Sequence, residues 1–542
     1  MSESSPSPTW SARLWQLSSR WLLPILTGVL MALSYPSFNI GECAWICLLP
    51  LLFAMEGGNP RQAFWRGYLA GAVFFGMTIW WTVHVTILGT VALIAVLALY
   101  FGAAATGFAL VRQKTGAGDV FVWNLVYALV GTSWWVTLEW VRGHFLFGGF
   151  GWNGMGVSQH QTLPLIQIAS ITGVYGVSVL VVLVNFGIYF TVRRFLGPAM
   201  GESSMRRLSW ELYAVVIVLC GAFLYGLDIL RKEPATARGL RIALIQGNIP
   251  QSLKFDPNQK PMVLQRYRAL TEKASLLKPE LIIWPETALP DALRYDADSY
   301  GLATNMVARA NAFLLTGSID MAAGKTGIEH FNGAVLMGAD GRLLGLYHKI
   351  HLVAFGEYVP LRKILPIFKY FTPIDGSFER GQAHHIFHLP NLRFGTVICF
   401  EDTLPDLYRK FVKQGVDFMV NLTNDGWFKE SPAAEMHLAN AIFRAVETRR
   451  PLVRCTNNGV TCVVDEYGHI NPRQRLPLHQ EGMLVCELAL PHQMEVTFYT
   501  QHGDWLVGCC ALISAAAMGW FAWQARSGSV KTLAFHKNMG VM

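Results

Sequence analysis

Four side chains with the chemistry of acyl transfer follow apolar stretches that resemble buried strands. Glu286 lies in LIIWPETALP, and Cys399 ends the apolar run of RFGTVICFED. Lys349 and Glu357 lie between them, in YHKIHLVAFGEYVP. A carboxylate can take the proton of a thiol as a general base, and the thiolate can then attack a carbonyl carbon. A nearby ammonium lowers the pKa of the thiol and stabilises the oxyanion of the tetrahedral intermediate.

Each of these side chains also has a purely structural interpretation. A single Glu or Lys at the end of a strand is usually solvated or ion-paired, and free cysteine is among the most buried residue types. Two interpretations of Cys399, a small core residue and a displayed nucleophile, therefore remain open at this point. Only the fold can bring Glu286, Lys349 and Cys399 together, because they are far apart in the sequence.

Strand-like and helix-like stretches alternate in the part of the chain that carries these residues. The strand-like runs are 241–246, 281–284, 313–317, 333–337, 396–399, 418–422, 452–455 and 461–464. The helix-like stretches are 262–277, 300–311 and 434–449. This alternation predicts an α/β fold with active-site residues at the carboxyl ends of strands.

The composition predicts a membrane protein with a globular insert. Of the 542 residues, 52% are hydrophobic and only 15% are charged, which is too apolar for a soluble enzyme of this length. Long apolar runs dominate before residue 232, and another lies near the end of the chain. We expect a transmembrane region of seven spans at 1–232 and an extracytoplasmic catalytic domain at 233–500. A final transmembrane helix and a cytoplasmic tail are expected at 501–542.

Eight candidate spans follow from the roughly 20 apolar residues that cross a bilayer. They are 21–38, 43–56, 66–84, 87–111, 120–140, 164–192, 211–230 and 504–524. Lys and Arg gather in alternate loops and near both termini, so the positive-inside rule predicts that both termini are cytoplasmic. The net charge of +8 reflects this bias and does not indicate nucleic acid as a partner.

Features outside the four side chains leave further alternatives open. Glu139 and Arg142 end the fifth span and are expected to pair near the outer interface. The loop at 143–156, rich in glycine and aromatic residues, is a candidate lipid-access element. Cys455 and Cys462 are the only close pair among the insert's cysteines, so a disulfide and two free thiols both remain open.

The chain resembles the nitrilase superfamily, whose hydrolases use a Glu-Lys-Cys triad. The resemblance lies in four segments that occur in the expected order: WPETALP, YHKIHLVAFGEYVP, ICFEDTLP and NLTNDGWF. With QGNIPQSLKFDP before them, TFYTQHGDW after them and the spans around them, the whole chain resembles the apolipoprotein N-acyltransferase family. The resemblance implies a four-layer α-β-β-α sandwich inserted in an eight-helix transmembrane bundle. It also implies the bacterial inner membrane, with the catalytic domain on the periplasmic side.

The resemblance assigns roles to five charged or nucleophilic residues. It implies that Glu286 is the general base, Cys399 the nucleophile and Lys349 the cation that stabilises the oxyanion. Glu357 matches a second carboxylate that orients the lysine or assists proton transfer. Glu401 matches the acid of the Cys-aromatic-Glu motif.

The resemblance also implies substrate contacts by four aromatic residues, namely Phe255, Phe400, Trp427 and Phe428. Phe400 stands where the family often has tyrosine, so this chain lacks that hydroxyl. Phe255 stands where relatives commonly have tryptophan. The sequence predicts a structural role for Asn332.

The implied reaction is ping-pong. Cys399 takes an acyl chain from the sn-1 position of a phospholipid, usually phosphatidylethanolamine, and passes it to the free α-amino group of a diacylglyceryl-cysteine in an apolipoprotein. We expect no metal and no soluble cofactor, and we expect a monomer. Two rival interpretations remain: a membrane-tethered amidase or nitrile hydrolase with water as acceptor, and a transporter with an extracytoplasmic binding domain.

Overall fold

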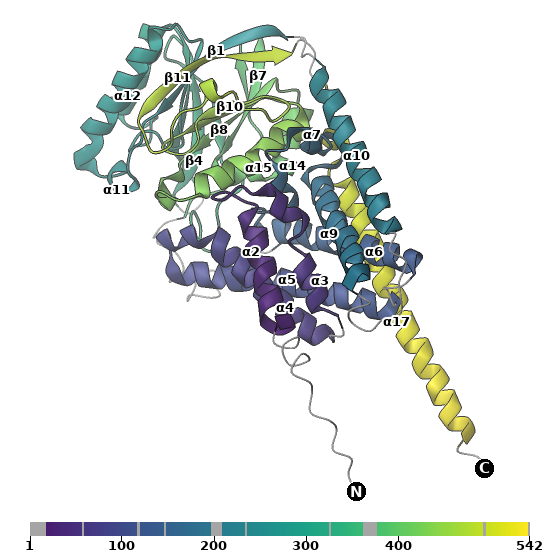
Figure 1. Cartoon of the computed structure of the whole chain (residues 1–542). Coiled ribbons are helices and arrows are strands. Elements are labelled where there is room, and N and C mark those ends of the chain that lie inside the picture. Colours follow the sequence, from purple (N-terminus) through teal and green to yellow (C-terminus); the bar gives the residue numbers. More distant parts are fainter. Residues whose placement is uncertain are drawn as a thin grey trace.

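A computed structural model of the chain describes residues 18–56, 59–115, 120–145, 148–196, 209–232, 236–324, 327–360, 377–491 and 495–539. Figure 1 shows a sheet-containing part at one end and a bundle of helices at the other. The long helix α17 (Trp505–Met539) returns from the sheet-containing part along the bundle. The sheets thus lie between helical segments along the chain, and the predicted domain division stays a prediction.

Five helices are long and apolar enough to cross a membrane by length and composition. They are α5 (Ile87–Thr115), α6 (Phe121–His144), α9 (Val174–Leu196), α10 (Trp210–Arg231) and the Trp505–Gln524 part of α17. The predicted span 164–192 is wrong in its start. Two short helices, α7 (Leu163–Ile166) and α8 (Ala169–Thr172), precede α9. Gly173, with φ of +68°, ends α8 and separates it from α9.

The other three predicted spans form shorter or less apolar helices among the described residues. The first contains α2 (Leu23–Leu33), and the second is divided into a 3-10 turn (Gly41–Trp45) and α3 (Leu49–Ala54). The third, 66–84, overlaps only the later part of α4 (Pro60–Thr78), whose first two turns carry Arg61 and Arg66. The count of eight crossings stays a prediction for these segments.

Close packing of α4 against α5 depends on two glycines. A Cβ on Gly67 would overlap the carbonyl oxygen of Phe101. A Cβ on Gly71 would lie 2.8 Å from the Cβ of Phe101. Small residues allow helix backbones to approach where the surrounding lipid provides no hydrophobic drive for association.

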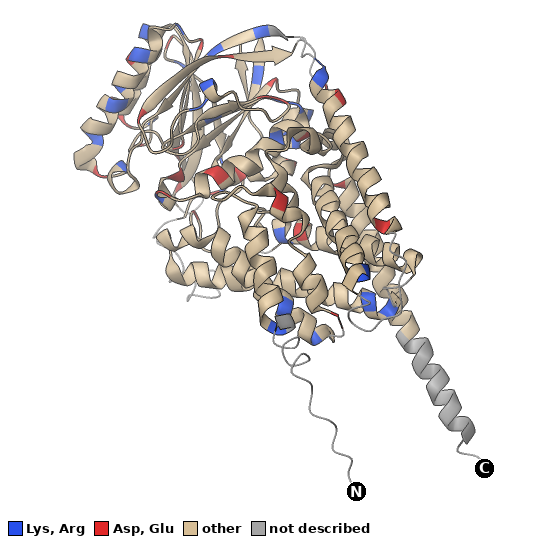
Figure 2. Cartoon of the chain, viewed as in Figure 1, with Lys and Arg blue, Asp and Glu red and all other residues tan. Residues whose placement is uncertain are grey.

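Basic residues gather at the end of the bundle that is far from the sheets, where Figure 2 shows the blue segments. Arg112 and Lys114 lie in the last turn of α5, and Arg193 and Arg194 in that of α9. Arg112 and Arg193 both contact Glu56 at 3.2 Å. Arg13, Arg206 and Arg207 lie outside the described residues.

Two sheets lie face to face in the insert. The six-stranded sheet has the order β11 (Gly482–Pro491), β1 (Thr236–Gln246), β2 (Leu281–Trp284), β3 (Phe313–Ala323), β4 (Ile328–Met337), β5 (Leu343–His348). The five-stranded sheet has the order β10 (Cys462–Val464), β9 (Leu452–Thr456), β8 (Phe418–Thr423), β7 (Leu392–Ile398), β6 (Ile386–Leu389). Strands β1, β2 and β3 are parallel, as are β7, β8 and β9.

Helices cover the outer faces of both sheets, which confirms the four-layer α-β-β-α arrangement. Helix α12 (Lys260–Ser275) lies on one side, and α14 (Pro405–Lys413) and α15 (Ala433–Thr448) lie on the other (Figure 1). Helix α13 (Ala297–Ala310) packs beside α12. Every residue of α15 except Glu435 is buried, because this helix lies between its sheet and the membrane region.

All four cysteines of the insert are free thiols, so the disulfide alternative for Cys455 and Cys462 is wrong. Cys462 lies opposite Arg454 in the β9–β10 pair. Successive side chains of a strand point to opposite faces, so the side chains of Cys455 and Cys462 lie on opposite faces of the sheet. The Cys455 thiol instead contacts the carbonyl oxygen of Ile283 at 3.2 Å, in the core between the sheets.

Candidate active site

The three predicted catalytic side chains follow the carboxyl ends of three strands. Glu286 comes two residues after β2, Lys349 directly follows β5, and Cys399 directly follows β7. Cys399 has φ of +53°, a conformation that is unfavourable for residues other than glycine and persists where the surroundings hold it. Its carbonyl oxygen accepts a hydrogen bond from Asn421 Nδ2 at 2.8 Å. The half-buried Cys399 is therefore displayed on a strained turn rather than in the middle of a core strand.

A compact network joins Glu286, Lys349 and Glu357. Lys349 is 1% exposed, and its Nζ lies 2.9 Å from Glu357 and 3.8 Å from Glu286 Oε1. Asn332 Nδ2 donates to Glu286 Oε1 at 2.8 Å and to Glu357 Oε1 at 2.9 Å. The backbone N–H of Asn424 donates to Glu286 Oε2 at 2.9 Å. Asn332, for which the sequence predicts only a structural role, thus holds both carboxylates in place.

The electrostatics keep the Cys399 thiol protonated at rest and make Glu286 a stronger base than an exposed glutamate. Burial raises the pKa of Glu286, which the Lys349 charge counteracts. Burial and the charge of Glu286 raise the pKa of the Cys399 thiol well above its usual value. Burial alone would lower the pKa of Lys349, but the carboxylates of Glu357 and Glu286 outweigh it and raise that pKa. The resting site therefore has a protonated thiol beside a permanent ammonium and a carboxylate of increased basicity.

Glu401 fixes the turn that carries Cys399. This buried carboxylate accepts hydrogen bonds from Tyr347 Oη at 2.9 Å and from the backbone N–H of Ile350, His351 and Ile398 at 2.8 to 2.9 Å. Burial raises the pKa of Glu401 to about 7, against the charge of Lys349 and the N–H donors. Glu401 thereby joins the chain after β5, which carries Lys349, to the end of β7.

Replacing Glu401 with glutamine is expected to lower the free energy of unfolding by about 2–4 kcal/mol. The amide retains one acceptor oxygen, so at least one buried donor loses its partner, and each such loss costs about 1–3 kcal/mol. Denaturant unfolding of the purified protein in detergent measures the change. Glu430→Gln, at an exposed carboxylate, is the matched control and should stay within about 0.5 kcal/mol of wild type. Equal stability of Glu401→Gln and wild type would contradict the role assigned to Glu401.

A buried histidine contacts the main chain of Cys399. His437 on α15 lies 2.7 Å from Asp402 and 3.1 Å from Asp425, and its Nε2 lies 3.2 Å from the carbonyl oxygen of Cys399. Burial lowers the pKa of His437, but the Asp402 and Asp425 carboxylates outweigh it and raise that pKa to about 9. Arg454 also contacts Asp402 within this cluster.

The stability of the protein should depend on pH through His437. Its pKa of about 9 in the folded state exceeds the usual 6.5, so its contribution is complete below pH 6.5 and is lost as pH rises through 9. A shift of this size corresponds to about 3 kcal/mol. Melting temperatures measured from pH 6 to 9.5 should therefore fall more steeply for wild type than for His437→Gln. Parallel curves for the two proteins would contradict a charged His437.

Aromatic contacts connect this cluster to the membrane region. The rings of Trp81 and Phe428 lie 4.4 Å apart, those of Trp81 and Trp152 lie 5.4 Å apart, and that of Trp152 lies 5.2 Å from His437. Trp152 belongs to the loop at 143–156 and is buried, so this part of the loop packs against the catalytic domain. Residues 146 and 147 of the loop lie outside the described residues.

The expected pair of Glu139 and Arg142 is not formed in the described structure. Glu139 accepts from Met155 N at 2.8 Å and from Ser178 Oγ at 2.6 Å, whereas Arg142 donates to the carbonyl oxygen of Trp152 at 2.8 Å. Both side chains hold the loop at 143–156 against the helices.

The four predicted substrate contacts occupy different environments. Phe255 and Trp427 are 45% and 41% exposed, which leaves area for an apolar ligand. The Phe400 ring lies 5.6 Å from Lys349 Nζ, whereas Phe428 packs on Trp81. Contact with substrate stays a prediction for all four.

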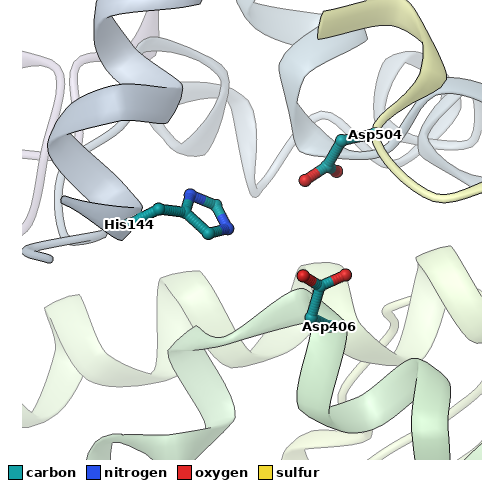
Figure 3. Close-up of side chains that lie close together, drawn as sticks. All are labelled: His144, Asp406 and Asp504. Carbon is teal, nitrogen blue, oxygen red and sulfur yellow. The ribbon is translucent and has the colours of Figure 1, made fainter. Parts of the chain in front are cut away.

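One group of side chains among the described residues has the spacing of metal ligands. Figure 3 shows His144, Asp406 and Asp504, whose ligand atoms lie within 4.8 Å of one another. Asp504 already accepts hydrogen bonds from Trp140 Nε1 at 2.8 Å and Tyr499 Oη at 2.7 Å. The group joins the ends of α6 and α17 to α14 and does not include the residues around Cys399, so we assign it a structural role.

Two family models match separate parts of the chain. The apolipoprotein N-acyltransferase N-terminal domain matches residues 27–187, and the carbon-nitrogen hydrolase model matches residues 241–494. The boundary between the matches agrees with the change from helices to sheets.

Curated relatives match nearly the whole chain. The apolipoprotein N-acyltransferase of Geobacter metallireducens is 36% identical over 523 residues, covering 94% of this chain and 96% of its own. That of Bradyrhizobium diazoefficiens is 30% identical, covering 92% and 94%. Among solved structures, an amidase from Nesterenkonia sp. is 18% identical with a TM-score of 0.36, covering 50% of this chain and 97% of its own.

Proposed function

Because this chain belongs to the apolipoprotein N-acyltransferase family, it is an enzyme that N-acylates lipoproteins, and we propose that it does so through a thioester on Cys399. The observation that carries the proposal is the arrangement of three strand ends. A carboxylate, an ammonium and a displayed thiol lie together there, with Glu286 and Lys349 3.8 Å apart.

The first half-reaction forms the thioester. Glu286 takes the Sγ proton of Cys399, and the thiolate attacks the carbonyl carbon of the sn-1 ester of a phospholipid. The Lys349 ammonium stabilises the tetrahedral oxyanion. When the intermediate collapses, the carbon–oxygen bond of the ester breaks, and the leaving alkoxide takes the proton from Glu286. A lysophospholipid is released, and the acyl chain stays on Cys399.

The second half-reaction forms the amide. The free α-amino group of a diacylglyceryl-cysteine attacks the thioester carbonyl, and Glu286 takes a proton from the amine. The carbon–sulfur bond then breaks, and the departing thiolate regains a proton from Glu286. The amine competes with water because the packed aromatic contact of Trp81, Trp152 and Phe428 borders the site on the membrane side.

Finer features of the function are also proposals. We infer phosphatidylethanolamine as the usual donor, a diacylated apolipoprotein as the acceptor, and a monomeric enzyme in the bacterial inner membrane. The basic residues at the far end of the bundle support a cytoplasmic location for that end and a periplasmic location for the catalytic domain (Figure 2). A carbon-nitrogen hydrolase with water as acceptor is not favoured, because relatives that span nearly the whole chain are named N-acyltransferases.

A chase experiment tests the acceptor. Enzyme loaded with a labelled acyl chain is mixed with a diacylated lipopeptide that has a free N-terminus, or with the same lipopeptide acetylated at that amine. We expect the label to move to the free-amine peptide and to remain on the enzyme with the acetylated one. Release of the label as free fatty acid at the same rate in both mixtures would indicate a hydrolase.

A further inference from the structure

A second lysine lies at the active site and contacts the main chain of Glu286, whereas Lys349 lies near its carboxylate. Lys254 ends the short helix α11 (Gln251–Lys254), and its side chain is 0% exposed. Its Nζ donates to the backbone carbonyl oxygen of Glu286 at 2.9 Å. A fully buried lysine is rare and costly unless a polar partner compensates the charge.

The same helix also contacts the Glu286 carboxylate through one intermediate residue. Gln251 Oε1 accepts from Asn424 Nδ2 at 2.8 Å, and the backbone N–H of Asn424 donates to Glu286 Oε2 at 2.9 Å. Lys254 therefore holds the main chain of Glu286, while Gln251 holds the residue that positions its side chain. Phe255, the next residue, is 45% exposed and marks the outer surface of this segment.

Lys254 adds a cation beside Glu286, where the charged His437 does not reach, because His437 pairs with Asp402 and Asp425. Glu286 and Glu357 are two potential negative charges, and the charge of Glu286 passes to Cys399 when Glu286 takes the thiol proton. Lys349 is a single positive charge, and it lies closer to Glu357, at 2.9 Å, than to Glu286, at 3.8 Å. Asp425 adds a further negative charge that acts on the thiol. Without Lys254, the negative charge that moves from the Glu286 carboxylate to the Cys399 thiolate would lie in a low-dielectric site beside a lysine that is paired more closely with Glu357.

Lys254 is electrostatically coupled to both reacting groups. Burial lowers its pKa to about 8, and the charges of Glu286 and Cys399 raise it. The side chain is thus mainly an ammonium at neutral pH, and it becomes more so when the thiol ionises.

We propose that Lys254 is a positioning residue and the second cation of the active site, which holds Glu286 through its carbonyl oxygen and stabilises the Cys399 thiolate together with Lys349. This inference rests on the proposed function of Cys399. A role confined to packing would leave the ionisation of the thiol unchanged, so the thiol itself reports on the proposal.

The test measures how fast Cys399 reacts with iodoacetamide, a neutral reagent, across pH 6 to 10. The modified Cys399 peptide is quantified by mass spectrometry in wild type, Lys254→Met and Lys254→Arg. Lys273→Met, at an exposed lysine of α12, is the matched control. At pH 7 we expect about tenfold slower modification of Lys254→Met, with the apparent thiol pKa about one unit higher. Lys273→Met should follow wild type at every pH. Lys254→Arg should follow wild type below pH 8, where Lys254 is charged, and should react faster than wild type above it.

Lys254→Gln separates charge from hydrogen bonding and replaces Lys254→Met if that variant does not fold. Its amide retains a donor for the Glu286 carbonyl but carries no charge, so it should shift the thiol pKa as Lys254→Met does. A curve for either neutral variant that coincides with wild type would overturn the proposal. Failure of the proposed function is distinguishable: wild-type Cys399 would then react with iodoacetamide but would take no acyl chain from phospholipid.

Discussion

Cys399→Ala should acylate lipopeptide at less than about one thousandth of the wild-type rate. Without the thiol the acyl chain cannot be stored on the enzyme, and removal of a nucleophile from a catalytic group that acts as a unit costs several orders of magnitude. Transfer of a labelled acyl chain from phospholipid to a diacylated lipopeptide, followed by thin-layer chromatography, measures the rate. The fold should survive, because the half-buried thiol makes way for a smaller side chain.

The matched control is Cys486→Ala, at a half-buried free thiol on β11. This variant should retain at least about half of the activity, because substitutions away from special features change little. Residual activity above about one tenth in Cys399→Ala would return Cys399 to the role of a core residue.

Glu286→Gln should slow formation of the acyl-enzyme by about 10²- to 10⁴-fold, the usual contribution of a positioned general base. The variant keeps nearly the same shape, but it cannot take the thiol proton. In wild type the rate should rise with pH through the pKa of Glu286, because only the ionised carboxylate acts as a base. Burial raises that pKa above its usual value, so this acid limb lies at higher pH than for an exposed glutamate.

Single-turnover acylation measured from pH 4.5 to 8 checks this prediction. The acid limb should be absent in Glu286→Gln, and the surface variant Glu272→Gln on α12 should retain the wild-type profile. An unchanged acid limb in Glu286→Gln would assign the base to another group.

Much of the fold could be predicted because local patterns determine it. The run 281–284 coincides with β2, and the helix-like stretch 434–449 differs from α15 by one residue at each end. Strands β5, β6 and β11 were missed. Residues of β5 and β11 are partly exposed, so their pattern is not the continuous apolar run of a buried strand.

The membrane region was harder to predict. A window of apolar residues does not show that Gly173 interrupts the span 164–192, where the Tyr499 ring lies in the position that a Cβ would need. Composition along the chain also does not distinguish a full-length span from the divided helices at 41–54.

Some residues of the candidate site could likewise be predicted from the sequence, and others could not. Glu286, Lys349, Glu357, Cys399 and Glu401 lie in local motifs, and the structure brings them together. Lys254, Asn332 and His437 have no such signal, because their roles depend on contacts between distant parts of the chain. Lys254 lies in the segment QGNIPQSLKFDP, but the sequence does not show that the folded protein buries it against Glu286.

The most direct test of the account is to find where the acyl chain resides. Wild-type protein is incubated with phosphatidylethanolamine, digested at mildly acidic pH and analysed by tandem mass spectrometry. The account predicts a fatty-acyl mass on the peptide that contains Cys399, removed by neutral hydroxylamine and lost when diacylated lipopeptide is added. An acyl chain on a different residue, or lipopeptide acylation without any acyl-enzyme in single-turnover samples, would contradict it.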